Sequence, residues 1–176
     1  MKFRFCLPYY KNSTRELEIL DQNENIVGSL KKFNDNKLLN DIGKHISNNF
    51  VMNIRTNSFD EQDKNYLIKT TNAFELFYKM GTFSLWRNDV QIGLIREQRK
   101  LNIALNFTIK EKEYRAEKKI GQLNTIHFYS IIEDKKEYIA VAQRSLNNEV
   151  KLEVFHNNDV DYILLLAICY LHTIIA

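Results

Sequence analysis

Hydrophobic and polar residues alternate along most of the chain. In the clearest run, residues 101–110, the apolar side chains of Ile103, Leu105, Phe107 and Ile109 are separated by smaller or polar ones. Successive side chains of a strand point to opposite faces, so this period of two predicts a strand with one buried face. The same alternation is found at Phe3/Phe5/Leu7, Phe74/Leu76/Tyr78, Phe83/Leu85, Ile92/Leu94, Ile126/Phe128 and Val150/Leu152/Val154.

Short polar segments separate these runs. They lie at residues 11–13, 22–25, 87–89, 133–135 and 147–148 and consist mainly of Asn, Asp, Glu and Lys. Asn and Asp favour tight turns, and turns at such short intervals predict about twelve short strands in an antiparallel barrel or sandwich. One exception lies between residues 35 and 50, where apolar residues recur at helical spacing and predict an amphipathic helix near residues 36–48.

A second helix is predicted at about residues 159–175. Asp159 and Asp161 can cap its start and complement the helix dipole, and residues 162–171 are apolar on every side. Such a helix must be buried in protein or in lipid. A membrane span needs about 20 apolar residues, whereas this segment is shorter and contains His172. We therefore expect no transmembrane span, but a helix along the axis of a closed barrel that forms one domain over residues 1–176.

Two stretches of the chain are weakly repeated. Residues 17–31 align with residues 82–96, so that Gly28 matches Gly93 and Val27 matches Ile92. Each reads as a strand, a polar turn and a second strand with a glycine in its middle. A glycine inside a strand usually marks a bulge, a bend or the close approach of another backbone.

These repeat units, together with the segment at residues 155–170 in which aspartates lead into the apolar helix, resemble the tubby C-terminal-like superfamily. This superfamily includes tubby proteins, phospholipid scramblases, plant LURP-one-related proteins and small bacterial relatives. The resemblance implies a mainly β fold, a closed antiparallel barrel of about twelve strands around a central helix. It also implies a non-enzymatic binding module, since tubby proteins bind phosphoinositide headgroups on the barrel exterior.

Composition and charge limit the partners and the location. The net charge of +3 over 176 residues is too small for a dedicated nucleic-acid binder. Cys6 and Cys169 lie in apolar patterns, and no apolar run of signal-peptide length opens the chain, so we expect a reducing, cytoplasmic setting, including the inner face of the membrane.

One part of the chain is basic, because residues 95–120 contain 8 basic and 4 acidic residues. Clusters of Lys and Arg bind lipid phosphates through charge-assisted hydrogen bonds. The candidate anion-binding residues are Lys31, Lys32, Arg96, Arg99, Lys100, Arg115, Lys118 and Lys119. Four glutamates interleave with the basic residues of this block, so an ordinary solvated surface remains the alternative.

Catalytic groups are not brought together by any recognisable spacing. His127 is expected on the outer face of a strand, and His172 is expected to hydrogen-bond a strand from the central helix. The sequence contains no zinc-ligand, calcium-loop or phosphate-loop motif, and we predict no enzyme activity, no cofactor and no metal.

Three functions remain open from the sequence. The first is a module that binds anionic phospholipid headgroups or a protein partner on the barrel exterior, where Trp86 is a candidate interface anchor. The second is a membrane-anchored or scramblase-like protein, which requires the terminal helix to leave the barrel. The third is a small-molecule carrier, which requires space that a central helix would occupy.

Overall fold

A computed structural model describes residues 1–9, 13–33, 53–59, 64–71, 81–99, 103–155 and 160–175. The strands among these residues are β1 (Lys2–Cys6), β2 (Leu17–Asp21), β3 (Ile26–Phe33), β4 (Asn53–Ser58), β5 (Tyr66–Thr70), β6 (Thr82–Arg87), β7 (Val90–Arg99), β8 (Ile103–Ile109), β9 (Lys112–Glu117), β10 (Thr125–Ile132), β11 (Lys135–Arg144) and β12 (Glu149–Val154). They are followed by helix α3 (Tyr162–Ile175). The amphipathic helix predicted near residues 36–48 lies outside the described residues.

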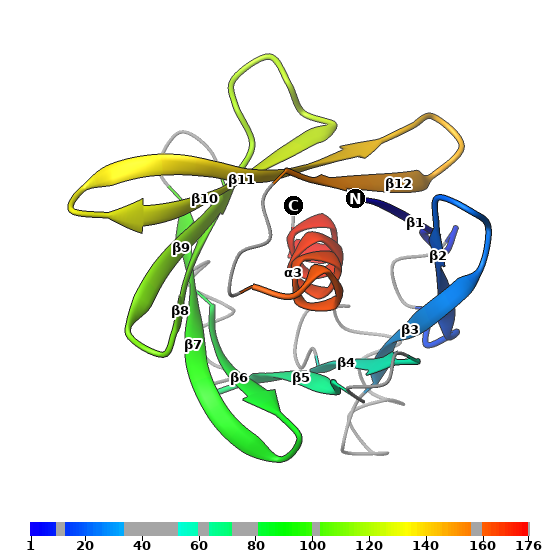
Figure 1. The fold of residues 1–176 in the computed structure, drawn as a ribbon, viewed down its shortest axis with the longest axis horizontal. Helices are drawn as coiled ribbons and strands as arrows, with labels where there is room; N and C mark the ends of the chain where they lie inside the picture. Colours follow the sequence, from blue (N-terminus) through cyan, green and yellow to red (C-terminus); the bar gives the residue numbers. More distant parts are fainter. Residues whose placement is uncertain are drawn as a thin grey trace, which may run out of the picture.

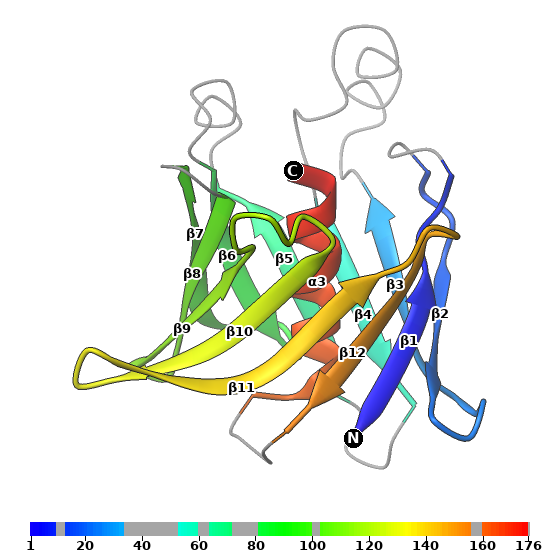
Figure 2. The same cartoon turned by 90° about the horizontal axis from the view of Figure 1, so that it is seen from above.

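The strands form a closed antiparallel barrel. Each strand pairs with its neighbour in the sequence, and β1 pairs with β12 to close the ring, with Phe3 opposite Leu152 and Phe5 opposite Val150. Figure 1 shows the ring of strands with α3 in its centre, and Figure 2 shows the same helix from the side, running along the barrel. The predicted barrel with a central helix is therefore confirmed.

The core lies between the strands and α3. Every residue of α3 from Ile163 to His172 is buried, and inward side chains such as Ile19, Ile54 and Leu105 are fully buried around it. Burying one large apolar side chain contributes about 1.5–3 kcal/mol, which explains why a helix of only 14 residues without a polar face is stable here. The helix occupies the axis where a carrier barrel would hold its ligand.

The two repeated glycines allow neighbouring backbones to approach closely. A Cβ atom added to Gly93 would lie 1.8 Å from the carbonyl oxygen of Thr108, and one added to Gly28 would lie 2.6 Å from that of Asn57. In both units the preceding residue, Val27 or Ile92, is the extra residue of a β-bulge, because the register shifts there. The predicted role of these glycines is confirmed.

Polar contacts hold the two ends of α3. Near its start, Lys64 Nζ lies 3.0 Å from Asp161 Oδ2, and Leu165 N donates to Asp161 O at 3.1 Å. Near its end, His172 Nε2 hydrogen-bonds the carbonyl oxygen of Ile103, the first residue of β8, at 3.0 Å, as predicted for this histidine. Burial lowers the pKa of His172 to about 4, so the ring is neutral at pH 7 and donates this bond through Nε2.

Candidate functional site: a cationic outer face

The predicted pair Lys31 and Lys32 is divided between the two faces of β3. Lys31 is exposed on the outer face, whereas Lys32 points inward with Leu30 and is only 4% exposed. Desolvation lowers the pKa of Lys32, as expected for an ammonium group that has lost its water. Only Lys31 of this pair is presented on the outer surface.

Arg96 and Arg115 are brought into one row across β7, β8 and β9. Arg96 is opposite Asn106, and Asn106 is opposite Arg115. Arg96 is exposed, but Arg115 already donates to Gln98 Oε1 at 3.2 Å, to Asn106 Oδ1 at 3.3 Å and to the Glu117 carboxylate. Arg115 is therefore part of a surface network, while Arg96 remains available.

The last predicted residues lie beyond β9 and at the end of β7. Lys119 is exposed, and Lys118 is close enough to α3 for its charge to act on Cys169 and His172. Lys100 and the side chain of Arg99 lie outside the described residues. Of the eight predicted residues, the structure thus places Lys31 on the outer face of β3 and Arg96 on the outer face of β7, with β4, β5 and β6 between these two strands.

Two further cations, which the sequence did not reveal, complete this surface. Arg55 on β4 is directly opposite Lys31, and Lys69 on β5 lies two residues beyond Leu67, the partner of Arg55. We call Lys31, Arg55, Lys69 and Arg96 the cationic face. None of the four has a carboxylate partner among the described residues, and β3, β4, β5 and β6 contain no acidic residue.

Several cations elsewhere on the described outer wall are paired with carboxylates. Arg4 Nη1 lies 2.6 Å from Glu149 Oε1, Lys136 Nζ lies 2.7 Å from Glu117 Oε1, and Lys151 Nζ lies 3.2 Å from Glu149 Oε2. On the cationic face, by contrast, Lys31 and Arg55 are like charges directly opposite each other, an arrangement that destabilises a sheet. The cationic face is therefore the candidate anion-binding surface of the described residues.

Aromatic rings support the cations of this face. The Arg55 guanidinium lies 5.0 Å from the centre of the Phe33 ring, and Lys69 Nζ lies 5.8 Å from that of Trp86. Trp86 Nε1 donates to Ser84 Oγ at 2.8 Å and the indole remains partly exposed beside Lys69. The outward position predicted for Trp86 is confirmed, and the rings fix the direction of the two charges.

The remaining titratable side chains form structural contacts. On the outer face of β10, His127 Nδ1 accepts from Tyr138 Oη at 2.9 Å and Nε2 donates to Gln122 Oε1 at 2.8 Å. Burial lowers the pKa of His127, with a smaller contribution from Lys119. Within the described ranges, no group of His, Cys, Asp and Glu is arranged to hold a metal ion.

Comparison with known proteins identifies the family. The family model for the Tubby C-terminal like domain matches residues 3–176. The chain belongs to this family. Searches of curated proteins and of solved structures gave no match.

Tubby C-terminal-like domains are a family of binding modules that are generally not enzymes. In this tubby-like domain, the part of the chain that the structure describes contains no helix long and apolar enough for a membrane span. On the cationic face, cations without carboxylate partners among the described residues lie beside aromatic rings, and such cations can form charge-assisted hydrogen bonds with an anion.

Proposed function

We propose that this tubby-like domain is a non-enzymatic module that binds anionic phospholipid headgroups through the cationic face. The observation that carries this proposal is the pair Lys31 and Arg55, which lie directly opposite each other without an acidic partner. A phosphate between them replaces repulsion by two charge-assisted hydrogen bonds. Lys69 on β5 and Arg96 on β7 extend the positive surface across the same wall of the barrel.

The position of the face on the outer wall suits a membrane surface. Strands β3 to β6 form one continuous side of the barrel in Figure 1. The partly exposed indole of Trp86 sits among the cations, and such amphipathic rings favour the headgroup level of a bilayer. The proposed setting is peripheral, at the anionic cytoplasmic leaflet.

The strength of binding follows from the number of cations. Each Lys or Arg close to an anionic membrane surface contributes about 1 kcal/mol. Four residues therefore contribute about 4 kcal/mol, which corresponds to a roughly thousandfold increase in partitioning over neutral lipid. This attraction is screened by salt, since the Debye length is only about 8 Å at physiological ionic strength.

Vesicle co-sedimentation of the full chain tests the proposal. We expect binding to vesicles that contain phosphatidylserine or a phosphoinositide, weaker binding at high salt, and no binding to phosphatidylcholine alone. The variant Lys31→Gln/Arg55→Gln/Lys69→Gln is expected to lose roughly a hundredfold in partitioning, because three contributions of about 1 kcal/mol disappear.

A matched control separates this face from net charge. The variant Lys2→Gln/Lys110→Gln/Lys135→Gln removes the same charge from other parts of the surface and is expected to bind almost as well as the unmodified chain. Equal losses in the two variants, or no binding of the unmodified chain to any anionic vesicle, would exclude the cationic face as a lipid site.

A further inference from the structure

One end of the barrel carries exposed apolar side chains on its connecting loops. This is the end at which α3 finishes, and Figure 2 shows the C-terminus there with the β9–β10 and β11–β12 connections. Ile120 and Leu123, between β9 and β10, are 77% and 73% exposed, and Leu146, between β11 and β12, is fully exposed. Tyr9, after β1, is 91% exposed. Exposed apolar side chains that gather in one place mark a site for a membrane or another protein.

Backbone hydrogen bonds join these connections to one another. Arg144 N donates to Asn124 O at 2.8 Å and links the β9–β10 connection to the end of β11. Leu7 N donates to Asn148 O at 2.9 Å and links the segment after β1 to the β11–β12 turn. Two successive turns, each closed by a backbone hydrogen bond of 3.0 Å, make up residues 119–125. The exposed apolar side chains are therefore carried by one connected surface.

Cations flank the apolar side chains of this end. Lys118 and Lys119 open the β9–β10 connection, and Arg144, directly before the β11–β12 turn, is exposed. The two connections, residues 118–124 and 145–148, contain no acidic residue. Apolar side chains together with Lys and Arg suit a partner that is apolar inside and anionic at its surface, which is the chemistry of an anionic bilayer.

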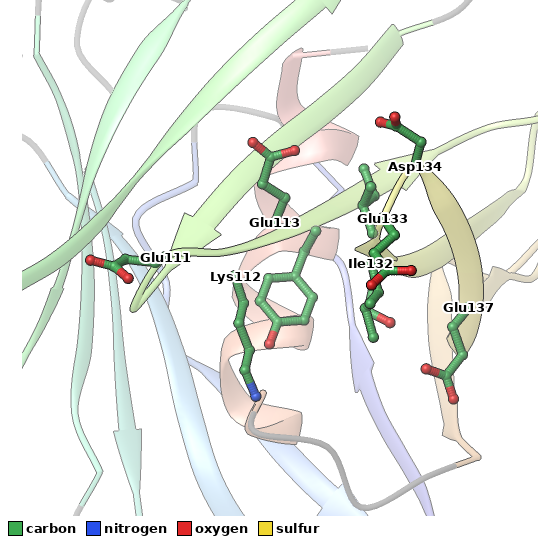
Figure 3. A pocket seen from close by; sticks show the side chains of 10 residues that line it. Glu111, Lys112, Glu113, Ile132, Glu133, Asp134 and Glu137 are labelled. Carbon is green, nitrogen blue, oxygen red and sulfur yellow. The ribbon is translucent and has the colours of Figure 1, made fainter.

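The opposite end of the barrel also exposes apolar side chains, but they lie beside carboxylates. Ile132 is 58% exposed and directly precedes Glu133 and Asp134 of the β10–β11 turn (Figure 3). Val90, which is 64% exposed, directly follows Asp89. An anionic surface would repel these carboxylates. Charge therefore favours the end at which α3 finishes as the end that meets a membrane.

The cationic face lies near the same end of the barrel. Lys31 and Arg55 are each two residues from the strand end that leads there, Lys69 is one residue from it and Arg96 is three. At about 3.3 Å per residue, all four lie within roughly 10 Å of this end along their strands. The headgroup layer of each leaflet is about 5–8 Å thick, and long basic side chains extend towards it. The cations can therefore contact headgroups while the loops enter the apolar layer.

We propose that the end of the barrel at which α3 finishes enters an anionic bilayer, with Ile120, Leu123 and Leu146 as its apolar anchors. This inference rests on the proposed lipid binding and adds to it which end of the domain enters the membrane. The axis of α3 then stands roughly along the bilayer normal, and the helix itself stays inside the barrel. The anchors supply apolar transfer, which the cationic face alone does not provide.

Co-sedimentation of the full chain with vesicles of phosphatidylserine and phosphatidylcholine tests the anchors. The variant Ile120→Ser/Leu123→Ser is expected to lose roughly ten- to a hundredfold in partitioning, because full burial of one such side chain contributes at least about tenfold. The ratio between variant and unmodified chain should persist as salt is raised, since ions do not screen apolar transfer. The control variant Ile26→Ser/Val90→Ser removes two exposed aliphatic side chains at the opposite end and should change partitioning less than about twofold.

A fluorophore on Cys6 tests the orientation. Cys6 is exposed at the end of β1 that leads to the anchors, whereas Cys169 is buried. An environment-sensitive dye on Cys6 is expected to shift its emission to shorter wavelength when anionic vesicles are added. The same dye on Lys135→Cys in a Cys6→Ser background, at the opposite end of the barrel, should show no shift.

The outcomes separate this inference from the proposed function. Equal vesicle binding by Ile120→Ser/Leu123→Ser and the unmodified chain, or an emission shift at Lys135→Cys and not at Cys6, would overturn the inference and leave lipid binding by the cationic face standing. Dimerisation that Ile120→Ser/Leu123→Ser abolishes without affecting vesicle binding would also overturn it, with a second copy of the chain as the occupant. No binding of the unmodified chain to any anionic vesicle would refute the proposed function, and this inference with it. Circular dichroism establishes that each variant is folded.

Discussion

Replacing Gly93 by alanine tests the close approach of β7 and β8. The added methyl carbon would lie 1.8 Å from the carbonyl oxygen of Thr108 on β8. A close C···O contact is about 3.3 Å, so that carbonyl must move by roughly 1.5 Å, the difference between the two distances. Because it belongs to the backbone of the paired strand, no side-chain rotation can relieve the contact.

The cost has two parts. Overpacking of a tight site costs about 1–3 kcal/mol. The displacement also weakens the ladder where Gly93 is opposite Ile109 and Leu94 is opposite Thr108, and each lost backbone hydrogen bond costs about 1 kcal/mol. We expect Gly93→Ala to lower the free energy of unfolding by about 3–5 kcal/mol, which is a fall of roughly 10 °C in the melting temperature.

Urea and thermal unfolding, followed by circular dichroism, measure this loss against two other glycines. At Gly28 the nearest backbone oxygen would lie 2.6 Å from the added carbon, so a smaller loss is expected. Gly121 has open space around it but a φ of +83°, and its replacement by alanine should cost only about 1 kcal/mol. A loss at Gly93 no greater than that at Gly121 would refute the role of close strand approach.

The two remaining predictions concern α3. Burial raises the pKa of the Cys169 thiol to about 12. We therefore expect a thiol reagent to modify the exposed Cys6 rapidly and to modify Cys169 only when the protein unfolds. Rapid modification of Cys169 in the native protein would show that the helix leaves the barrel. The pKa of His172 is about 4 when folded, against 6.5 ordinarily, so the unfolded chain binds its proton first and stability falls as pH decreases from 6.5 towards 4, by about 3 kcal/mol in total. The free energy of unfolding of the His172→Gln variant, measured between pH 6.5 and pH 4, should decline less steeply than that of the unmodified chain. Equal declines in the variant and in the unmodified chain would contradict this prediction.

The interior of the fold was largely predictable, because its patterns are local. Alternating residues such as Leu105 and Phe107 mark the inward face of β8, and the continuous apolar run of α3 leaves no polar face for solvent. Gly28 and Gly93 marked close strand approach in the same way. These features depend on the period of two in a strand and 3.6 in a helix, which neighbouring residues in the sequence specify.

The cationic face was only partly predictable. Arg55 was missed because β4 places the polar residues Thr56 and Ser58 on its inner side, which hides the alternation. Thr56 is tolerated there because its hydroxyl accepts a hydrogen bond from Tyr66 N at 3.1 Å. Lys32 was assigned to the same site as Lys31, although adjacent residues of a strand point to opposite faces.

The sequence by itself determined most of the strands, the buried helix and the positions where strands approach closely, since each depends on local periodicity or on one residue type. Only the tertiary structure decided which charges meet, because pairing register places Lys31 directly opposite Arg55. These residues are separated by more than twenty positions in the chain. Surface charge has no local period, so its grouping follows from strand pairing alone.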